Sequence, residues 1–453
     1  MNREQVLASA EQQEIAFAQL EFVDPVGIGR GVLLAREHLP QALNRGINFS
    51  VSTMAVSLDS HIVVPELGVQ AGDFWAVADP STYVVLPYLE RTAHLFADLV
   101  DADGRPWPGC PRAALRRQCA AAAQELGRVT LGFEQEGALV KRENGRPRWA
   151  HEGHFFNFDI LNAEHPFLLD LVGVLRAMGI EPEKARAENQ FGQIELNIRY
   201  GEPLAAVEQH WRFKQAFRHL ARRHGLIGTF MPKPFMEAQG SGLHLHIGLR
   251  DSAGHDLFFD PDDDSGLELS ALGRHFLAGL LAHSGGILAL GSPSVNSYKR
   301  LLPGTWSPAH SGYAVGNRSV FVRVVESRPA AAGGPSAKRL ELRSPDGTCN
   351  PYFLAIAVIA AGRDGVRRAL DPGPALTGHD TAELSAAERE RLGARFLPRT
   401  LDQALAVLEA DEVLREALGP LLFGSFLAAK RDELESYHTV ISEWEYAHYL
   451  EHF

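Results

Sequence analysis

The chain has 453 residues, of which 45% are hydrophobic and 22% are charged. A chain this long and apolar can bury a large core, which excludes intrinsic disorder. It carries 44 Lys and Arg against 56 Asp and Glu, so its net charge of −12 indicates neither a nucleic-acid partner nor an anionic membrane surface. Three cysteines cannot form a disulfide framework, and no apolar stretch is long enough to span a bilayer. We therefore expect a cytoplasmic protein.

The first hundred residues predict a small unit of mixed helix and strand. Its first elements are a helix at Arg3–Gln13 and strands at 15–24 and 31–39. Between these strands lies the glycine-rich string "GIGRG" (27–31). A phosphate-binding loop would lead into a helix, whereas a strand follows here, so a tight hairpin is the better interpretation. A turn-rich segment then predicts a boundary between a domain of residues 1–100 and a domain of residues 101–453.

The second domain is predicted to mix helices with strands. Helices are expected at 111–126, 164–178, 203–224, 266–284 and 351–369, and the chain from Leu401 onward is predicted to be all helical. Strands are expected at 129–141, 193–200, 242–249, 318–325 and 338–344. Residues 330–337 are predicted to form a flexible loop between the last two strands.

Four of these strands alternate charged and apolar residues, so each has one charged face. Those faces carry Glu134 and Glu136; Gln193, Glu195, Asn197 and Arg199; His244 and His246; and Arg339, Glu341 and Arg343. Alternation alone would indicate the solvent face of an antiparallel sheet. Solvent faces usually mix Lys, Thr, Ser and Gln, however, and these concentrate Glu, His and Arg. The composition favours a site over a solvated surface, with a structural ion-pair network as the alternative.

Charge repulsion indicates what such a site would need. Two carboxylates about 6.6 Å apart on one strand repel by about 2.5 kcal/mol at an effective dielectric near 20. Bringing Glu188, Glu195 and Glu341 beside them is unfavourable unless cations lie between. Sets of Glu with His favour Mg²⁺ or Mn²⁺ over Zn²⁺. The chain also lacks a Walker loop but is rich in arginine, which predicts phosphoryl transfer assisted by metal ions and guanidinium groups.

Seven strings in this order resemble the glutamine synthetase family. They are "FEQE" (133–136), "ENQFGQIE" (188–195), "GTFMPKPF" (228–235), "GSGLHLHIG" (240–248), "NSYKRLLPG" (296–304), "GNRSVFVRV" (316–324) and "KRLELRSPDGTCNPY" (338–352). The resemblance implies an α+β fold, with an N-terminal β-grasp-like domain and a catalytic domain built on a curved antiparallel sheet flanked by helices. It also implies a homo-oligomer of stacked rings.

The resemblance further implies roles for matching residues. Two Mg²⁺ or Mn²⁺ ions would be held, one by Glu136, Glu188 and Glu195, the other by Glu134, His244 and Glu341. ATP, as co-substrate, would contact Glu183, Tyr200, His246, Arg318, Arg323 and Arg339. Glutamate would contact Gly240, Arg300 and Arg343. Catalytic roles are assigned to Arg318, Arg300, Trp306 and Ser50.

Two positions depart from the pattern of family members that use ammonia. Those members carry an Asp in the N-terminal domain and an acidic residue in a later flap, where this chain has Ser50 and Trp306. A Trp face attracts an alkylammonium ion, and the two lost charges weaken the attraction for NH₄⁺. We therefore expect an ATP-dependent ligase that joins the γ-carboxylate of glutamate to an alkylamine or polyamine through γ-glutamyl phosphate. Glutamine synthesis from ammonia and a non-catalytic regulatory homologue remain alternatives.

Overall fold

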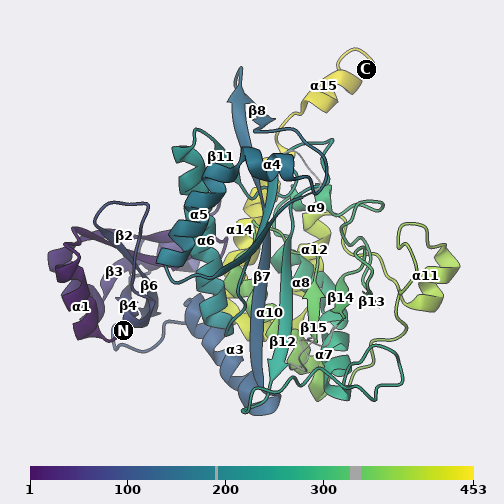
Figure 1. Ribbon diagram of the computed structural model, residues 1–453, viewed down its shortest axis with the longest axis horizontal. Coiled ribbons are helices and arrows are strands. Elements are labelled where there is room, and N and C mark those ends of the chain that lie inside the picture. The colour runs from purple at the N-terminus through teal and green to yellow at the C-terminus, as the bar shows by residue number, and fades with distance from the viewer. Residues whose placement is uncertain (189–191, 327–337) are drawn as a thin grey trace.

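The computed structural model describes residues 1–188, 192–326 and 338–453, so the loop predicted at 330–337 lies outside the described residues. A smaller sheet and a larger sheet with its helices lie side by side (Figure 1). No described helix is both long and apolar enough to cross a membrane.

The smaller sheet is built from the N-terminal hundred residues. Its elements are α1 (Arg3–Gln12), β1 (Phe17–Val23), β2 (Gly29–Ala35), α2 (Leu39–Asn44), β3 (Ile47–Ser50), β4 (Asp73–Ala78), β5 (Val84–Val85) and β6 (Thr92–Val100). Along the sheet the order is β2-β1-β6-β4-β3, with β5 paired to β6. The β1–β6 pair is parallel and the other pairs are antiparallel.

The hairpin interpretation of "GIGRG" is confirmed, because β1 and β2 pair in antiparallel register from Phe17 opposite Ala35 to Val23 opposite Gly29. Gly27 has a φ of +82°, which favours glycine, and the Ile28 amide donates to the Asp24 carboxylate at 2.9 Å. The second strand ends earlier than predicted because the chain turns helical after Ala35.

The larger sheet carries the charged faces. Its strands are β7 (Arg128–Glu143), β8 (Arg146–Trp149), β9 (Pro182–Ala187), β10 (Gln193–Ile198), β11 (Ile227–Thr229), β12 (Leu243–Arg250), β13 (Tyr313–Val315), β14 (Val322–Val325) and β15 (Arg339–Leu342). Among the described residues the order is β13-β14-β15-β12-β7-β10-β9, with β8 and β11 paired to β7. The β13–β14 pair at one edge is parallel, and the others are antiparallel.

Helices cover the apolar face of this sheet and fill the C-terminal third. They are α3 (Pro111–Glu125), α4 (Phe158–Ala163), α5 (His165–Ala177), α6 (Pro203–Arg223), α7 (Ala271–Ala282), α8 (Ser284–Gly291), α9 (Ser297–Arg300), α10 (Pro351–Arg367), α11 (Ala386–Leu392), α12 (Leu401–Glu409), α13 (Glu412–Leu418), α14 (Pro420–His438) and α15 (Glu443–Tyr449). Most of α10 is buried, and it lies so close to α7 that a Cβ on Gly279 would be 2.0 Å from the Ala361 carbonyl oxygen.

Two predicted elements begin later than expected, each for a local reason. The strand expected from residue 318 starts at Val322, because the Asn317 side chain accepts bonds from the amide and hydroxyl of Ser319 and turns the chain. The helix expected from residue 266 starts at Ala271, where the Ser270 hydroxyl caps it by accepting from the Gly273 amide.

A buried ion-pair network joins the smaller sheet to the helices of the larger one. Arg112, at the start of α3, is 3% exposed and donates to Glu208 of α6 at 2.7 Å. The same guanidinium reaches Asp98 of β6 at 2.6 Å and Asp79 at 3.0 Å. Because the network links residues on both sides of residue 100, the domain boundary there stays a prediction.

Replacing Arg112 by Ala should destabilise the fold strongly, because Glu208 would be left buried without its cation. Removing one partner of a buried pair typically costs about 3–5 kcal/mol in the free energy of unfolding. Urea unfolding followed by circular dichroism measures the change. Arg117→Ala, at an exposed position of the same helix, is the matched control and should change that free energy by less than about 0.5 kcal/mol. Equal effects for the two variants would contradict a structural role for the network.

Candidate active site

Sheet register brings the charged faces of the strands together. Glu195 of β10 lies opposite Glu136 of β7, and Glu134 of β7 lies opposite His244 of β12. Further along, Glu341 of β15 lies opposite His246 and Arg323. Glu136, Glu195, His244 and Glu341 are all buried. The four strands therefore form one polar centre, and the solvent-face interpretation is wrong.

Three carboxylates form the most crowded part of this centre. One oxygen each of Glu136, Glu188 and Glu195 lies within 4.8 Å of the others. Burial, followed by repulsion from neighbouring carboxylates, raises the pKa of Glu188 to about 7 and that of Glu195 to about 9. Arg186 lies 3.7 Å from Glu188 and 4.0 Å from Glu195, and the Glu195 Oε1 atom is buried without a hydrogen-bond partner. The triad is thus short of positive charge and could hold a cation.

A second acidic group lies next to the triad. Ligand atoms of Glu134, His246 and Glu341 fall within 4.8 Å of one another. His244 lies between the two groups: its Nδ1 is 3.2 Å from Glu134 and 3.7 Å from Glu341, and its Nε2 is 3.8 Å from Glu136. Although burial would raise the pKa of Glu134, hydrogen bonds and charge from His244 and His246 lower it well below its usual range. Glu134 therefore stays charged.

Two arginines keep Glu341 ionised at the base of this group. Arg323 donates to its Oε2 at 2.5 Å, and Arg343 donates to its Oε1. Although burial would raise the pKa of Glu341, Arg343, the two histidines and Arg323 together lower it to about 2. The carboxylate is thus an acceptor at any physiological pH, available to a cation as well as to the arginines.

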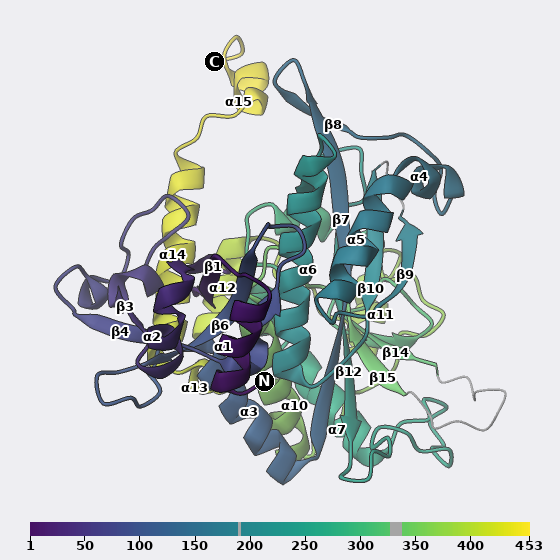
Figure 2. The same ribbon diagram turned by 60° about the vertical axis from the view of Figure 1, so that its left-hand side comes forward.

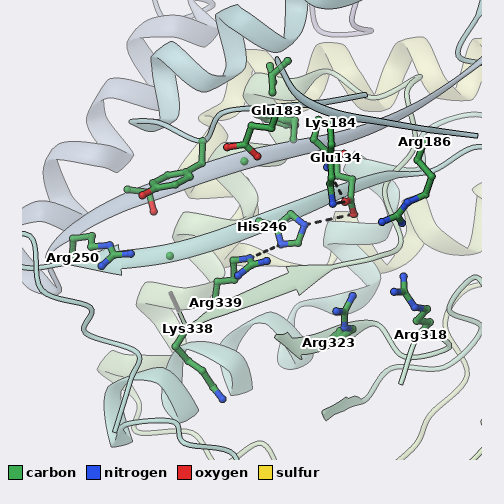
Figure 3. Close-up of a pocket in the computed structure, with 17 residues that line it drawn as sticks. Glu134, Glu183, Lys184, Arg186, His246, Arg250, Arg318, Arg323, Lys338 and Arg339 are labelled. Carbon is green, nitrogen blue, oxygen red and sulfur yellow. Dashed lines mark hydrogen bonds and ion pairs between the residues drawn. The ribbon is translucent and has the colours of Figure 1, made fainter. Parts of the chain in front are cut away.

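A cavity of about 470 Å³ opens beside Glu134 (Figure 3). Its cationic lining residues are Lys184, Arg186, Arg250, Arg318, Arg323, Lys338 and Arg339. All six residues assigned to ATP line it as well, namely Glu183, Tyr200, His246, Arg318, Arg323 and Arg339. Such an excess of cationic donors suits a polyphosphate. Sequence reasoning missed Lys184 and Arg186, although their alternation with Ala185 and Ala187 in β9 was the available signal.

A second cavity, of about 60 Å³, adjoins the first, because Arg186 and Arg318 line both. It brings together the glutamate triad, His244, Gly240, Arg300, Arg343 and Trp306. Arg300 is 2% exposed and donates to the carbonyls of Ser344 at 2.8 Å and Pro345 at 3.2 Å. Phe156 also lines this cavity, and the sequence analysis did not select it. The paired aromatics at 155–156 were the available signal.

Ser50 is placed apart from the other selected residues. It ends β3 in the smaller sheet, and its hydroxyl lies 2.8 Å from that of Ser52. It lines neither cavity in the described chain. Both views show β3 well away from β12 and β15 (Figures 1 and 2). A single chain therefore does not bring Ser50 to the polar centre.

Comparison with known proteins identifies the family. Residues 108–449 match the glutamine synthetase catalytic domain. The chain is 35% identical to a glutamine synthetase of Halobacterium salinarum, over 100% of this chain and 97% of that protein. It is 34% identical to a glutamate–methylamine ligase of Methyloversatilis universalis, over 98% of each. A solved structure titled "GmaS/ADP complex-Conformation 1" has a TM-score of 0.85 at 32% identity, over 98% of this chain and 99% of that one. The chain therefore belongs to the glutamine synthetase family, a family of ATP-dependent ligases.

Proposed function

We propose that this family member joins the γ-carboxylate of glutamate to an alkylamine or polyamine with ATP as co-substrate. The observation that carries the proposal is the pair of adjoining cavities. One has seven cationic side chains in its lining, which suit the phosphates of ATP, and the other combines a carboxylate triad with Arg300, Arg343 and an exposed Trp306. ATP use and three unpaired cysteines fit a cytoplasmic location.

The proposed reaction has two steps. An oxygen of the γ-carboxylate attacks the terminal phosphorus of ATP, the bond to the bridging oxygen of ADP breaks, and γ-glutamyl phosphate and ADP form. The amine nitrogen then attacks the acyl carbon, the carbon–oxygen bond to phosphate breaks, and the amide, inorganic phosphate and a proton are released. Arg318, which lines both cavities, is placed to balance the charge of the transferred phosphoryl group.

The donor set of this site fits divalent cations. One ion held by Glu136, Glu188 and Glu195 would give the buried Glu195 oxygen a partner. The same ion would offset the repulsion among the three carboxylates. A second would be held by Glu134, His244 and Glu341. Bound Mg²⁺ or Mn²⁺ would supply charge neutralisation for phosphate oxygens.

The contacts of His246 differ from those of His244. The Arg339 Nε donates to Nδ1 of His246 at 3.2 Å. Arginine can only donate, so Nδ1 of His246 is an acceptor and the proton of the neutral ring lies on Nε2, which faces Glu134 at 3.6 Å. The contact of His246 with Arg339 supports its proposed role on the nucleotide side.

The choice of an organic amine rests on Ser50 and Trp306, which replace the two acidic residues of ammonia-using members. The similarity to a glutamate–methylamine ligase agrees with it. The alternative is glutamine synthesis from ammonia, which is favoured by the equally similar relatives named glutamine synthetase. Ser50 would contribute to this site only if it came from a neighbouring copy of the chain.

We also propose a homo-oligomer in which the C-terminal segment docks on a second copy of this chain. Residues 439–453, including α15, extend away from the rest of the chain in both views (Figures 1 and 2). The apolar side chains that this segment exposes are Val440, Ile441, Trp444, Tyr446, Tyr449, Leu450 and Phe453. So much exposed apolar surface on one segment is typical of an interface.

Magnesium should stabilise the protein more at pH 8.5 than at pH 6. The pKa of Glu195 is raised in the folded state, so the folded chain binds more protons than the unfolded one between about pH 4.5 and 9. The stability of the metal-free protein therefore falls as pH rises through this window, and Mg²⁺ should restore it. We expect Mg²⁺ to raise Tm by about 2 °C at pH 8.5 in differential scanning fluorimetry.

Glu195→Gln should lose most of this Mg²⁺ response and should raise the Tm of the metal-free protein at pH 8.5, because it removes one repelling charge. Glu11→Gln, at an exposed position of α1, is the control and should behave like the wild type. A wild-type Tm that does not respond to Mg²⁺ at either pH would contradict the metal assignment.

The reaction itself is tested by phosphate release from ATP and glutamate with ammonia, methylamine, ethanolamine, n-butylamine or putrescine. We expect at least one organic amine to exceed ammonia in kcat/KM by about tenfold, which corresponds to about 1.4 kcal/mol of transition-state stabilisation. Release with ammonia alone would identify glutamine synthesis. Release with none of the amines would favour a non-catalytic role.

Removing residues 439–453 should reduce the oligomer mass measured by analytical ultracentrifugation, because the exposed apolar segment would be lost from the interface. The substitutions Trp444→Ala and Leu450→Ala, made together, should act in the same direction. Glu451→Ala, which removes an exposed charge from the same segment, should leave the mass unchanged. An unchanged mass after truncation would contradict docking by this segment.

A further inference from the structure

Three aromatic rings form a wall at the second cavity. Phe155 and Phe156 stack with their ring centroids 3.8 Å apart, and Phe155 meets Trp306 edge to face at 5.5 Å. Phe156 and Trp306 line the cavity that holds the glutamate triad. We call these three residues the aromatic wall. It joins two segments that are far apart in the sequence, so no sequence motif contains it.

The wall is exposed to an unusual degree for rings that already contact one another. The exposed fractions are 41% for Phe155, 47% for Phe156 and 54% for Trp306. Contiguous exposed aromatic surface beside a polar site commonly marks a ligand surface. About half of each ring surface is therefore left open to a small molecule that enters the cavity.

The wall has a cation-attracting character. The guanidinium of Arg186 already lies over the Phe156 ring, 5.0 Å from its centroid. Alkylammonium ions bind to aromatic faces through the same attraction, and their carbon atoms add apolar contact. The carboxylates of Glu136, Glu188 and Glu195 line the same cavity. The wall therefore offers an apolar, cation-attracting surface to the carbon substituent of an amine that enters the cavity beside these carboxylates.

A third cavity extends the space available to that substituent. It measures about 440 Å³ and is lined by residues 304–306, 315–319 and 378–380. Trp306 and Arg318 line both this cavity and the second one, which measures only about 60 Å³. The second cavity offers little room for a substituent of several carbons, and the third cavity next to it offers much more.

We propose that the aromatic wall and the third cavity together bind the carbon substituent of a primary amine of several carbons. This inference rests on the proposed ligase function and names the substrate class of its second step. Phe155, Phe156 and Trp306 act as specificity-determining residues that position the amine, and the bond-forming step is the one written above. Asp380, exposed at the third cavity, offers an anionic partner to the far end of a diamine.

The test compares kcat/KM for n-butylamine, putrescine, methylamine and ammonia in the wild type and in variants of the wall. We expect n-butylamine or putrescine to exceed both methylamine and ammonia by about tenfold in the wild type. Trp306→Ala should reduce kcat/KM for the longer amines, mainly through KM, by about tenfold more than it reduces kcat/KM for ammonia. Trp306→Phe should keep most of the wild-type kcat/KM for the longer amines, because it retains an aromatic face.

Phe155→Leu keeps apolar volume but removes the ring, and it should lower kcat/KM for the longer amines about threefold. Phe158→Ala is the matched control: this ring belongs to the same segment and is 72% exposed but lies outside the wall. Equal losses for ammonia and n-butylamine in Trp306→Ala would overturn the proposal, since they would indicate a general structural effect. A wild type that prefers methylamine or ammonia would overturn it as well.

Hydroxylamine separates the failure of this proposal from failure of the ligase function. It is a small nucleophile that needs no substituent site, so hydroxamate formation reports ligase chemistry alone. If the wild type forms no hydroxamate, the ligase function fails, and calorimetric titration with n-butylammonium chloride still tests the wall. Binding that weakens about tenfold in Trp306→Ala would support the wall, and absence of binding to the wild type would overturn it.

Discussion

Repulsion among buried carboxylates is the constraint on which this structure depends. Strand register places Glu195 opposite Glu136, and Glu188, just after β9, brings a third carboxylate within 4.8 Å. Burial removes much of the water that would screen them. Such a group persists in a folded protein because the surrounding core holds the strands in place. The triad is therefore unfavourable by itself and becomes favourable only when positive charge enters the cavity.

The rest of the site can be understood as an arrangement of positive charge around that group. Arg323 and Arg343 neutralise Glu341 at the base, and Arg323 also lines the larger cavity together with six other cationic side chains. Arg186 and Arg318 stand where the two cavities meet. A site with acidic and basic halves in contact can bring a carboxylate and a polyphosphate together, which would otherwise repel each other.

Apolar surface completes the arrangement on the side of the second cavity. The aromatic wall adds apolar surface beside the second cavity, and its rings attract organic cations. An acyl phosphate needs protection from hydrolysis, and an incoming amine needs a guide. Trp306 lines both the second cavity and the larger third one, which suits it to both needs in the proposed reaction.

Alternation of residues along single strands was enough to predict β7, β10, β12 and β15 with their charged faces, because side chains on a strand repeat every two residues. The strands β8, β9, β11 and β13 were not predicted from the sequence. Ordered motifs added the family and the candidate residues. Sequence alone could not show that Glu341 lies against Arg323 or that Phe155 meets Trp306, since both depend on pairing between distant segments. Nor could it show that Ser50 lies apart from the site within one chain. Local pattern determines which way a side chain points, whereas register and packing between segments decide what it meets.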